Sequence, residues 1–215
     1  MQITAHNIHL TIDGRDILNK VSVDVPSGTS VAITGPSGSG KTTLLNCLGL
    51  LLPVTQGQIL IDGVDVTKLS VARKRQFWRD NVAFIFQDYG LVPDESVGFN
   101  ICMESAPILR RRKGWGTRVE EALVKVGLVG RSADQVAKLS GGERQRVSIA
   151  RAIFKQARII FADEPTGSLD RRLAHEVFGL ILSMRERLGK SIVVVTHDLE
   201  IARRCDEVLD IAHPR

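Results

Sequence analysis

The chain alternates short runs of apolar, β-branched residues with longer segments whose apolar residues recur at helical spacing. Four of the short runs are almost entirely apolar, and this is typical of strands buried on both faces of a parallel sheet. They cover residues 30–34, 82–86, 159–162 and 192–196. Because such a sheet must be covered by helices, the pattern predicts an α/β protein.

The segments with helical spacing fall between these runs. They predict helices at residues 43–48, 117–126, 144–154, 171–188 and 199–204. A further amphipathic helix is expected around Phe77 and Trp78, with both aromatic rings turned inward. Its basic residues are Arg73, Lys74, Arg75 and Arg79.

The first part of the chain has the pattern of an antiparallel sheet. Strands are predicted at residues 2–11, 21–25 and 58–61, and a last strand at 207–211. The pairs Asp13-Gly14 and Asp62-Gly63 are typical of tight hairpin turns. Residues 88–138 are instead polar and helical.

A glycine-rich loop at residues 35–42 separates the first buried strand from the helix that follows it. It fits the pattern of a glycine, four residues and Gly-Lys-Thr, whose backbone amides wrap a phosphate. Lys41 is expected to reach the β- and γ-phosphates, and the Thr42 hydroxyl to ligate Mg²⁺. The strand–loop–helix placement argues against a chance match, so the sequence predicts binding of a nucleoside triphosphate. The expected contacts are Gly35, Pro36, Ser37, Gly38, Ser39, Gly40, Lys41, Thr42 and Thr43.

Two carboxylates, Asp163 and Glu164, follow the buried run 159–162. Ligands of open α/β sheets bind at this carboxyl end of the strands. Asp163 suits a Mg²⁺ contact through water, and Glu164 is placed to orient or deprotonate an attacking water. If this pattern stood alone in the chain, an ordinary Asp-Glu turn before Pro165 would be the alternative to a functional site.

Gln87 and His197 also follow buried strands and are therefore expected near the nucleotide. Either residue alone is more typical of an ordinary loop. Their placement at two strand ends favours a role in the site.

Ser140, Gly141 and Gly142 precede the predicted helix 144–154. A glycine-rich turn at a helix start offers unpaired N–H donors and the positive end of the helix dipole, so it is a candidate anion site. A helix start capped by Ser140 is the alternative.

Together these segments resemble the ATP-binding cassette (ABC) ATPases over essentially all 215 residues. Residues 35–42 match the Walker A loop, 139–143 the signature and 159–164 the Walker B strand. Gln87 matches the Q-loop glutamine, 168–170 the D-loop and His197 the switch histidine. The residues of these motifs are most similar to those of one branch of the family. That branch serves lipoprotein release, macrolide and peptide export, and cell-division signalling.

The resemblance implies a P-loop NTPase core with an antiparallel β subdomain and an inserted α-helical subdomain. The single ABC domain 1–215 would then have its core and β subdomain in residues 1–87 and 139–215, and its helical subdomain in about 88–138.

The resemblance also implies a head-to-tail homodimer, with ATP sandwiched between one copy's Walker A loop and the other's signature. Ser140, Gly141 and Gly142 would bind the partner's ATP, with Asp170 also at the nucleotide. Glu164 would catalyse hydrolysis and His197 stabilise the γ-phosphate. Gln87 would join Thr42 and Asp163 around Mg²⁺ and link the nucleotide state to a separate membrane permease.

Two departures from the family pattern stand out. Relatives usually place an aromatic residue near position 12 to stack on adenine, and here Ile12 stands there. We therefore expect looser binding of adenine, and the choice between adenine and guanine is open. The second departure is Phe99-Asn100-Ile101, where relatives usually carry Glu-Asn-Val, so Phe99 points to a different permease.

Composition excludes some classes of protein. No stretch reaches the roughly 20 apolar residues of a membrane span, and Met1 leads directly into a strand, so we expect a cytoplasmic protein peripheral to the inner face of the cell membrane. The net charge is only +5, and we expect no nucleic-acid partner. The basic run at 110–113 suits a solvated loop or a contact with anionic lipid or nucleic acid.

The leading hypothesis is the ATPase subunit of an ABC transporter, which powers a separately encoded membrane permease that exports a peptide, lipoprotein or hydrophobic compound. The main alternative is a cell-division-type complex that transmits force without cargo. ABC proteins of DNA repair or translation are disfavoured because they carry long insertions or two cassettes. A small-molecule P-loop kinase is disfavoured because the signature residues 139–143 would have no role in it.

Overall fold

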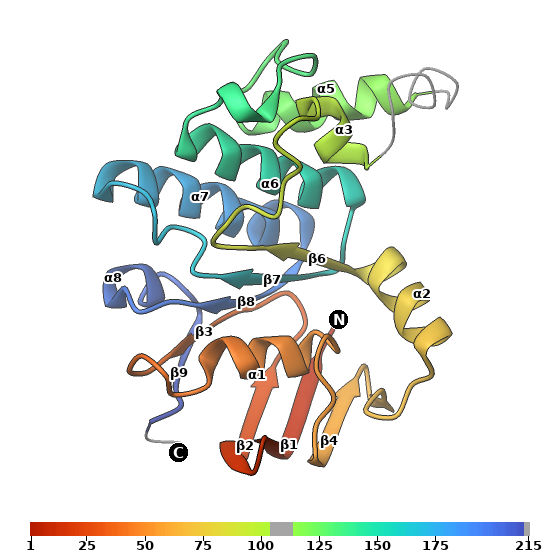
Figure 1. Cartoon of the computed structure of the whole chain (residues 1–215), viewed down its shortest axis with the longest axis vertical. Helices are drawn as coiled ribbons and strands as arrows, with labels where there is room; N and C mark the ends of the chain where they lie inside the picture. The colour runs from red at the N-terminus through yellow and green to blue at the C-terminus, as the bar shows by residue number, and fades with distance from the viewer. Residues whose placement is uncertain (104–113, 213–215) are drawn as a thin grey trace.

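The structure is a computed structural model that describes residues 1–103 and 114–212. Two β-sheets lie one above the other with helix α1 (Lys41–Leu48) between them, and long helices cover the far face of the larger sheet (Figure 1). The mixed α/β architecture predicted from the sequence is confirmed.

The larger sheet is parallel and has the strand order β6-β7-β8-β3-β9. Its strands are β3 (Ser30–Thr34), β6 (Val82–Ile85), β7 (Ile159–Asp163), β8 (Ser191–Val195) and β9 (Glu207–Asp210). The four predicted buried strands are all present, with their ends at most one residue from the expected positions. Because parallel strands end at one edge, the segments that follow β3, β6, β7 and β8 come together there.

The smaller sheet is antiparallel, with the order β2-β1-β4-β5. It contains β1 (Ile3–Ile12), β2 (Arg15–Val25), β4 (Gln56–Ile61) and β5 (Val64–Asp65). Asp13 and Gly14 have φ of 49° and 76°, the left-handed pair that a tight hairpin turn requires. Strand β2 begins well before the predicted residue 21, because the left-handed backbone of Lys20 interrupts the alternation that the prediction followed.

Alternate residues of the parallel strands point into two separate cores. Ile159 and Phe161 of β7 pack with α1 between the sheets, whereas Ile160 and Ala162 face the helices on the other side. This alternation explains why the strands are apolar throughout, since neither face contacts water.

The helices above the parallel sheet form a second layer. Helices α6 (Gly141–Lys155) and α7 (Arg171–Leu188) lie nearest to the sheet, and α3 (Val97–Cys102) and α5 (Trp115–Lys125) pack on α6 (Figure 1). The short elements η1 (Val136–Lys138) and α8 (Leu199–Ala202) complete the fold. Helix α6 starts before the predicted residue 144 because the glycines after Ser140 already form its first turn.

Helix α2 (Val71–Asn81) lies on the surface beside β6, and none of its residues is fully buried. Phe77 and Trp78 nevertheless turn toward the body as predicted and pack against the core between the sheets. The Trp78 Nε1 donates a hydrogen bond to the Gly49 carbonyl at 2.7 Å. No helix among the described residues combines the length and the apolar character that a bilayer crossing requires.

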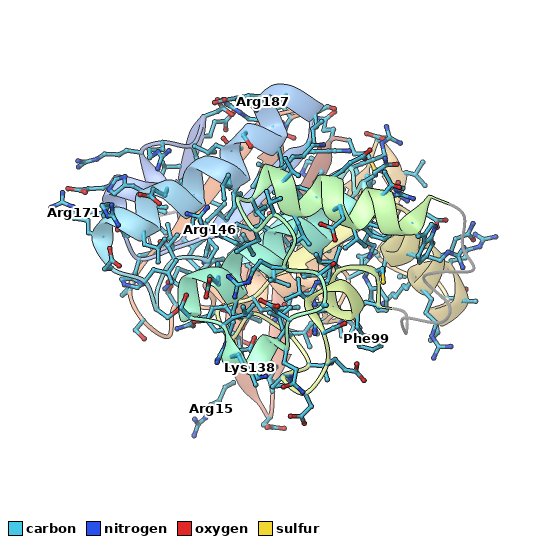
Figure 2. The ribbon with its side chains drawn as sticks, turned by 90° about the horizontal axis from the view of Figure 1, so that it is seen from above. Arg15, Phe99, Lys138, Arg146, Arg171 and Arg187 are labelled. Atoms are coloured by element: carbon cyan, nitrogen blue, oxygen red, sulfur yellow. The ribbon has the colours of Figure 1, made fainter. Side chains whose placement is uncertain are left out.

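The segment Phe99-Asn100-Ile101 forms part of α3. Asn100 is fully buried, and its amide binds both the N–H and the carbonyl of Val92. Phe99 is half-buried and lies on the outer part of α3 (Figure 2). Asn100 therefore stabilises the preceding loop through these hydrogen bonds, whereas Phe99 remains accessible.

Candidate functional site

The glycine-rich loop 35–42 joins β3 to α1 at the carboxyl edge of the parallel sheet (Figure 1). Gly40 has a left-handed φ of 89°, and a Cβ at this position would lie 2.9 Å from both the Ile17 carbonyl and Leu18. Conformation and space thus both require glycine here. The close approach fixes the loop against β2.

Lys41 is largely buried at the first position of α1. Its Nζ donates hydrogen bonds to the carbonyls of Gly35 at 2.9 Å and Pro36 at 2.8 Å. The loop thus curls around a positive charge at a helix N-terminus, where an anionic phosphate group is stabilised.

Thr42 and Asp163 are far apart in the sequence but meet in the structure. The Thr42 hydroxyl donates to Asp163 Oδ1 at 3.0 Å. Burial raises the pKa of Asp163, and the nearby charge of Glu164 raises it further, while the Thr42 bond acts in the opposite direction. A hydroxyl beside a carboxylate is the kind of oxygen pair that Mg²⁺ prefers, so these residues fit the ion.

Glu164 and His197 form a second pair beside the first. The His197 Nδ1 lies 2.9 Å from Glu164 Oε1, with Glu164 mostly covered and His197 71% exposed at its side chain. Glu164 has an unusual φ of 42° for a residue with a side chain, and its N–H bonds to the Val195 carbonyl. Strained backbone of this kind is held in place by its surroundings and is common at functional sites. Both side chains line a hollow of about 540 Å³.

Gln87 reaches this region from the end of β6. Its Nε2 lies 3.8 Å from the position that a Cβ on Gly167 would take, so it faces the loop after Glu164. Within the described residues it makes no hydrogen bond to Thr42 or Asp163. The structure therefore brings Thr42 and Asp163 into contact, and Gln87 faces the loop that follows Glu164.

The turn at Ser140 has the hydrogen bonds of a capped helix start. Ser140 Oγ accepts from the Glu143 N–H at 3.3 Å, and the Ser140 N–H donates to Glu143 Oε2 at 2.8 Å. This second bond, reinforced by Arg131, lowers the pKa of Glu143. The capping alternative is thus present in the structure, and the exposed Ser140 still lies at the positive end of α6.

Both glycines of this turn lie against other residues. A Cβ on Gly141 would be 2.9 Å from the Tyr89 hydroxyl, and one on Gly142 would be 2.3 Å from Leu173. No hydrogen bond joins Ser140, Gly141 or Gly142 to residues 35–42 within the described part of the chain. Helix α6 packs on one face of the parallel sheet and α1 on the other (Figure 1), so one copy of the chain carries two separate candidate anion sites.

Asp170 caps helix α7, because its Oδ1 accepts from the Leu173 N–H at 3.0 Å. The preceding Ser168 lies 3.0 Å from the Tyr89 hydroxyl. Sequence reasoning missed Tyr89 and Leu173, since neither belongs to a motif. The available signal for Tyr89 is its position as the single tyrosine of the chain, two residues after Gln87.

A further hollow of about 450 Å³ opens beside the phosphate loop. It is lined by Ile12, Asp13, Arg15, Ile17 and Thr43. None of these residues is aromatic, as the sequence indicated for Ile12. The basic run at 110–113 lies outside the described residues.

Comparison with known proteins places these features in one family. The family model of the ABC transporter matches residues 18–167. The lipoprotein-releasing system ATP-binding protein LolD of Bordetella pertussis is 40% identical over 203 residues, covering 93% of this chain and 87% of LolD. LolD of Bordetella parapertussis and of Bordetella bronchiseptica show the same identity and coverage.

Solved structures agree with the sequence comparison. The dimeric structure of MJ0796, a bacterial ABC transporter cassette, matches with a TM-score of 0.85 and 32% identity, over 97% of this chain and 93% of that chain. A post-hydrolysis MJ0796 structure bound to ADP and Pi matches with a TM-score of 0.84 at the same identity and coverage. The chain therefore belongs to the ABC transporter family, and it is an ATP-binding and ATP-hydrolysing subunit of such a transporter.

Proposed function

We propose that two copies of this chain close head to tail around ATP. The observation that carries the proposal is that the two candidate anion sites of one copy begin helices on opposite faces of the parallel sheet. A second copy would bring its Ser140 turn, with Gly141 and Gly142, to the phosphates held by residues 35–43. The dimeric structure of the MJ0796 cassette supports this arrangement.

The proposed roles follow from the geometry. Lys41 binds the β- and γ-phosphates, and Thr42 and Asp163 hold Mg²⁺. When bound, Mg²⁺ would neutralise charge that develops on the phosphate oxygens. Among the described residues no group of three or more His, Cys, Asp or Glu side chains could hold a metal, so we infer that Mg²⁺ is held jointly with the phosphates and water.

Glu164 is the proposed general base that orients and deprotonates the attacking water. His197 holds the Glu164 carboxylate through the 2.9 Å contact and, from its exposed position, contacts the γ-phosphate. Asp170 lies at the start of α7, where it faces the nucleotide in the closed pair. Hydrolysis cleaves the γ-phosphate from ADP, which breaks the covalent bridge between the two anion sites and favours opening of the pair.

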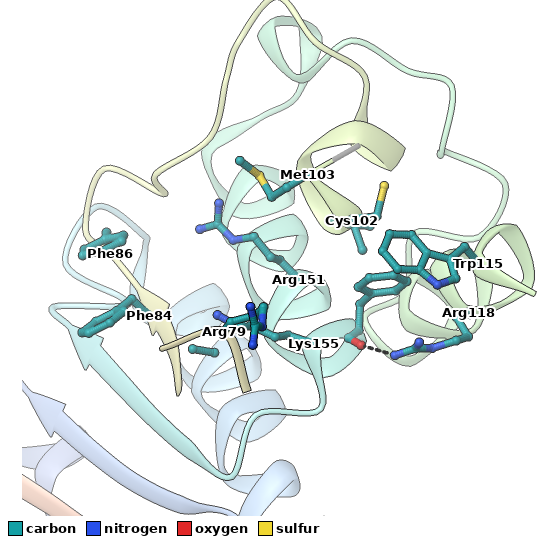
Figure 3. A pocket seen from close by; sticks show the side chains of 12 residues that line it. Arg79, Phe84, Phe86, Cys102, Met103, Trp115, Arg118, Arg151 and Lys155 are labelled. Atoms are coloured by element: carbon teal, nitrogen blue, oxygen red, sulfur yellow. Dashed lines mark hydrogen bonds between the residues drawn. The ribbon is translucent and has the colours of Figure 1, made fainter. Parts of the chain in front are cut away.

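The proposed permease site is a groove between β6, α3, α5 and α6 (Figure 3). This groove has a volume of about 560 Å³ and an apolar floor that includes Phe84, Phe86 and Phe154. Its rim carries the cations Arg79, Arg118, Arg151 and Lys155. An amphipathic segment with acidic side chains matches this chemistry, and Phe86 directly precedes Gln87, which would pass the nucleotide state to the partner.

The likeness to LolD supports a LolD-type role, in which the ATPase acts with a separate permease in lipoprotein release. The chain would then lie on the cytoplasmic face of the membrane. The cell-division-type alternative is not favoured, because the three Bordetella relatives named above are lipoprotein-releasing proteins. Within the chain we assign residues 1–87 and 139–215 to the core and β subdomain, and about 88–138 to the helical subdomain.

The variant Glu164→Gln tests the proposed site. Without a base it should bind ATP but not hydrolyse it, so Mg-ATP should shift the purified protein from monomer to dimer in size-exclusion chromatography. Wild-type protein under the same conditions should return to monomer as ATP is consumed. If the variant hydrolyses ATP at the wild-type rate, the assignment of the base is wrong.

A further inference from the structure

Tyr89 joins two loops that carry proposed catalytic groups. It follows Gln87 by two residues, and its hydroxyl lies 3.0 Å from Ser168 Oγ. Ser168 belongs to the loop between Glu164 and α7. One hydrogen bond thus links the loop of Gln87 to the loop of Glu164.

The backbone of Tyr89 is held by a side chain of α6. Arg151 donates to the carbonyl of Tyr89 at 3.1 Å and to that of Gly90 at 2.6 Å. Figure 3 shows Arg151 extending from α6 on the side of the segment that follows Phe86. Tyr89 itself has a left-handed φ of 68°, so this turn is held in a conformation that few residues adopt. The position of Tyr89 is therefore set by contacts at its backbone and at its hydroxyl.

The same hydroxyl lies beside the turn that binds the partner's nucleotide. A Cβ on Gly141 would be 2.9 Å from it, so only glycine fits while Tyr89 stays in place. One turn further along α6, both polar atoms of the Gln145 amide are buried without a hydrogen-bond partner among the described residues.

We propose that Tyr89 is a positioning residue of the ATPase. Its bond to Ser168 makes the loops of Gln87 and Glu164 move together, and its place beside Gly141 makes this movement respond to nucleotide bound at the Ser140 turn. This inference rests on the proposed head-to-tail pair and on the proposed roles of Gln87 and Glu164.

A double-mutant cycle on the purified chain tests the coupling. Tyr89→Phe and Ser168→Ala each remove one hydroxyl, so each should lower kcat several-fold, and the double variant should fall no further. KM for ATP should stay unchanged, because residues 35–43 are untouched. Ser168→Thr keeps a hydroxyl and should retain the wild-type kcat. If the two single effects multiply in the double variant, the hydroxyls act independently and the inference is wrong.

Ser183→Ala is the matched control, because among the described residues the Ser183 hydroxyl bonds only to the Leu180 carbonyl within α7. It should leave kcat and KM at their wild-type values. A loss of kcat in this control equal to that of Ser168→Ala would show a general effect of hydroxyl removal and would also overturn the inference.

Tyr89 allows a direct spectroscopic measurement, because it is the only tyrosine. Protein grown with 3-fluorotyrosine should give one fluorine resonance, and Ser168→Ala should shift it without nucleotide. Mg-ATP added to the Glu164→Gln variant should shift it again as the pair closes. A resonance that stays fixed while Mg-ATP forms the dimer would contradict the inference but leave the proposed function intact. Wild-type hydrolysis by Glu164→Gln would instead contradict the proposed function.

Discussion

At the scale of single residues, two adjacent carboxylates at the end of β7 have different surroundings. Asp163 is the last residue of the strand and accepts a hydrogen bond from Thr42. Glu164 leaves the strand with a φ of 42°, which turns its side chain toward His197. The change in backbone conformation between neighbours therefore separates the proposed ion-binding residue Asp163 from the proposed water-activating residue Glu164.

The variant Asp163→Asn should be more stable than the wild type at neutral pH but less active as an ATPase. Burial raises the folded-state pKa of Asp163, so the ionised side chain lowers the free energy of unfolding once the pH exceeds that pKa. The variant should therefore be more stable than wild type at neutral pH, and the gain should vanish as the pH falls through the pKa of Asp163. Hydrolysis of Mg-ATP should fall about 10- to 100-fold. Urea unfolding at several pH values and a steady-state ATPase assay measure the two effects.

Asp65→Asn is the control with the opposite sign. Hydrogen bonds from Thr67 lower the pKa of Asp65, so its ionised form stabilises the fold above the ordinary aspartate range. Its variant should lose stability at neutral pH and keep ATPase activity. A stability loss in Asp163→Asn would contradict the burial argument.

At the scale of elements, the first turns of α6 and α7 are packed so closely that Gly142 has no room for a side chain. Close packing against Leu173 thus explains the glycine at position 142, in addition to its proposed contact with the partner's ATP. Sequence reasoning found the glycine-rich turn but not this reason, because Leu173 lies on another helix and belongs to no motif. The contact is decided by how the two helices cross.

Gly142→Ala should destabilise the fold by about 1–3 kcal/mol, as overpacking does. Adding Leu173→Ala removes the clash and should restore much of the stability, so the double variant tests the nucleotide contact alone. We expect the double variant to bind ATP but to hydrolyse it much more slowly than Leu173→Ala. Thermal unfolding and ATPase rates measure both effects. Equal rates in Leu173→Ala and the double variant would show that Gly142 serves packing only.

At the scale of the whole molecule, the nucleotide edge and the proposed permease groove adjoin the same stretch of chain. Phe84 and Phe86 line the groove, and Gln87 follows them into the site. A partner that displaces this stretch would change the position of Gln87, and closure of the pair would act on the partner in the same way. Such coupling is reciprocal by thermodynamic necessity.

Arg79→Glu should weaken the complex with the permease several-fold, because it reverses a charge on the rim of the groove. Arg73→Glu on the same helix lies outside the groove and is the matched control. Affinity purification of the tagged chain from its own cells, with quantification of the captured integral membrane protein, measures the effect. Equal losses in both variants would indicate a general charge effect and remove the support for this groove.

The sequence by itself determined the parallel strands, the phosphate loop and the identity of the motif residues. These features are local, since continuous apolar runs, Asp-Gly turns and glycine spacing act within a few residues. Local pattern also determined that Ile12 leaves the hollow beside Thr43 without an aromatic ring.

Only the tertiary structure decided which distant residues meet. It paired Thr42 with Asp163, set Tyr89 between Ser168 and Gly141, and kept the Ser140 turn apart from the phosphate loop. These contacts depend on strand order and helix crossing, which no short stretch of sequence encodes. The physical reason is that a chain folds by burying its apolar faces, and polar residues at the strand ends are brought together as a consequence of that burial.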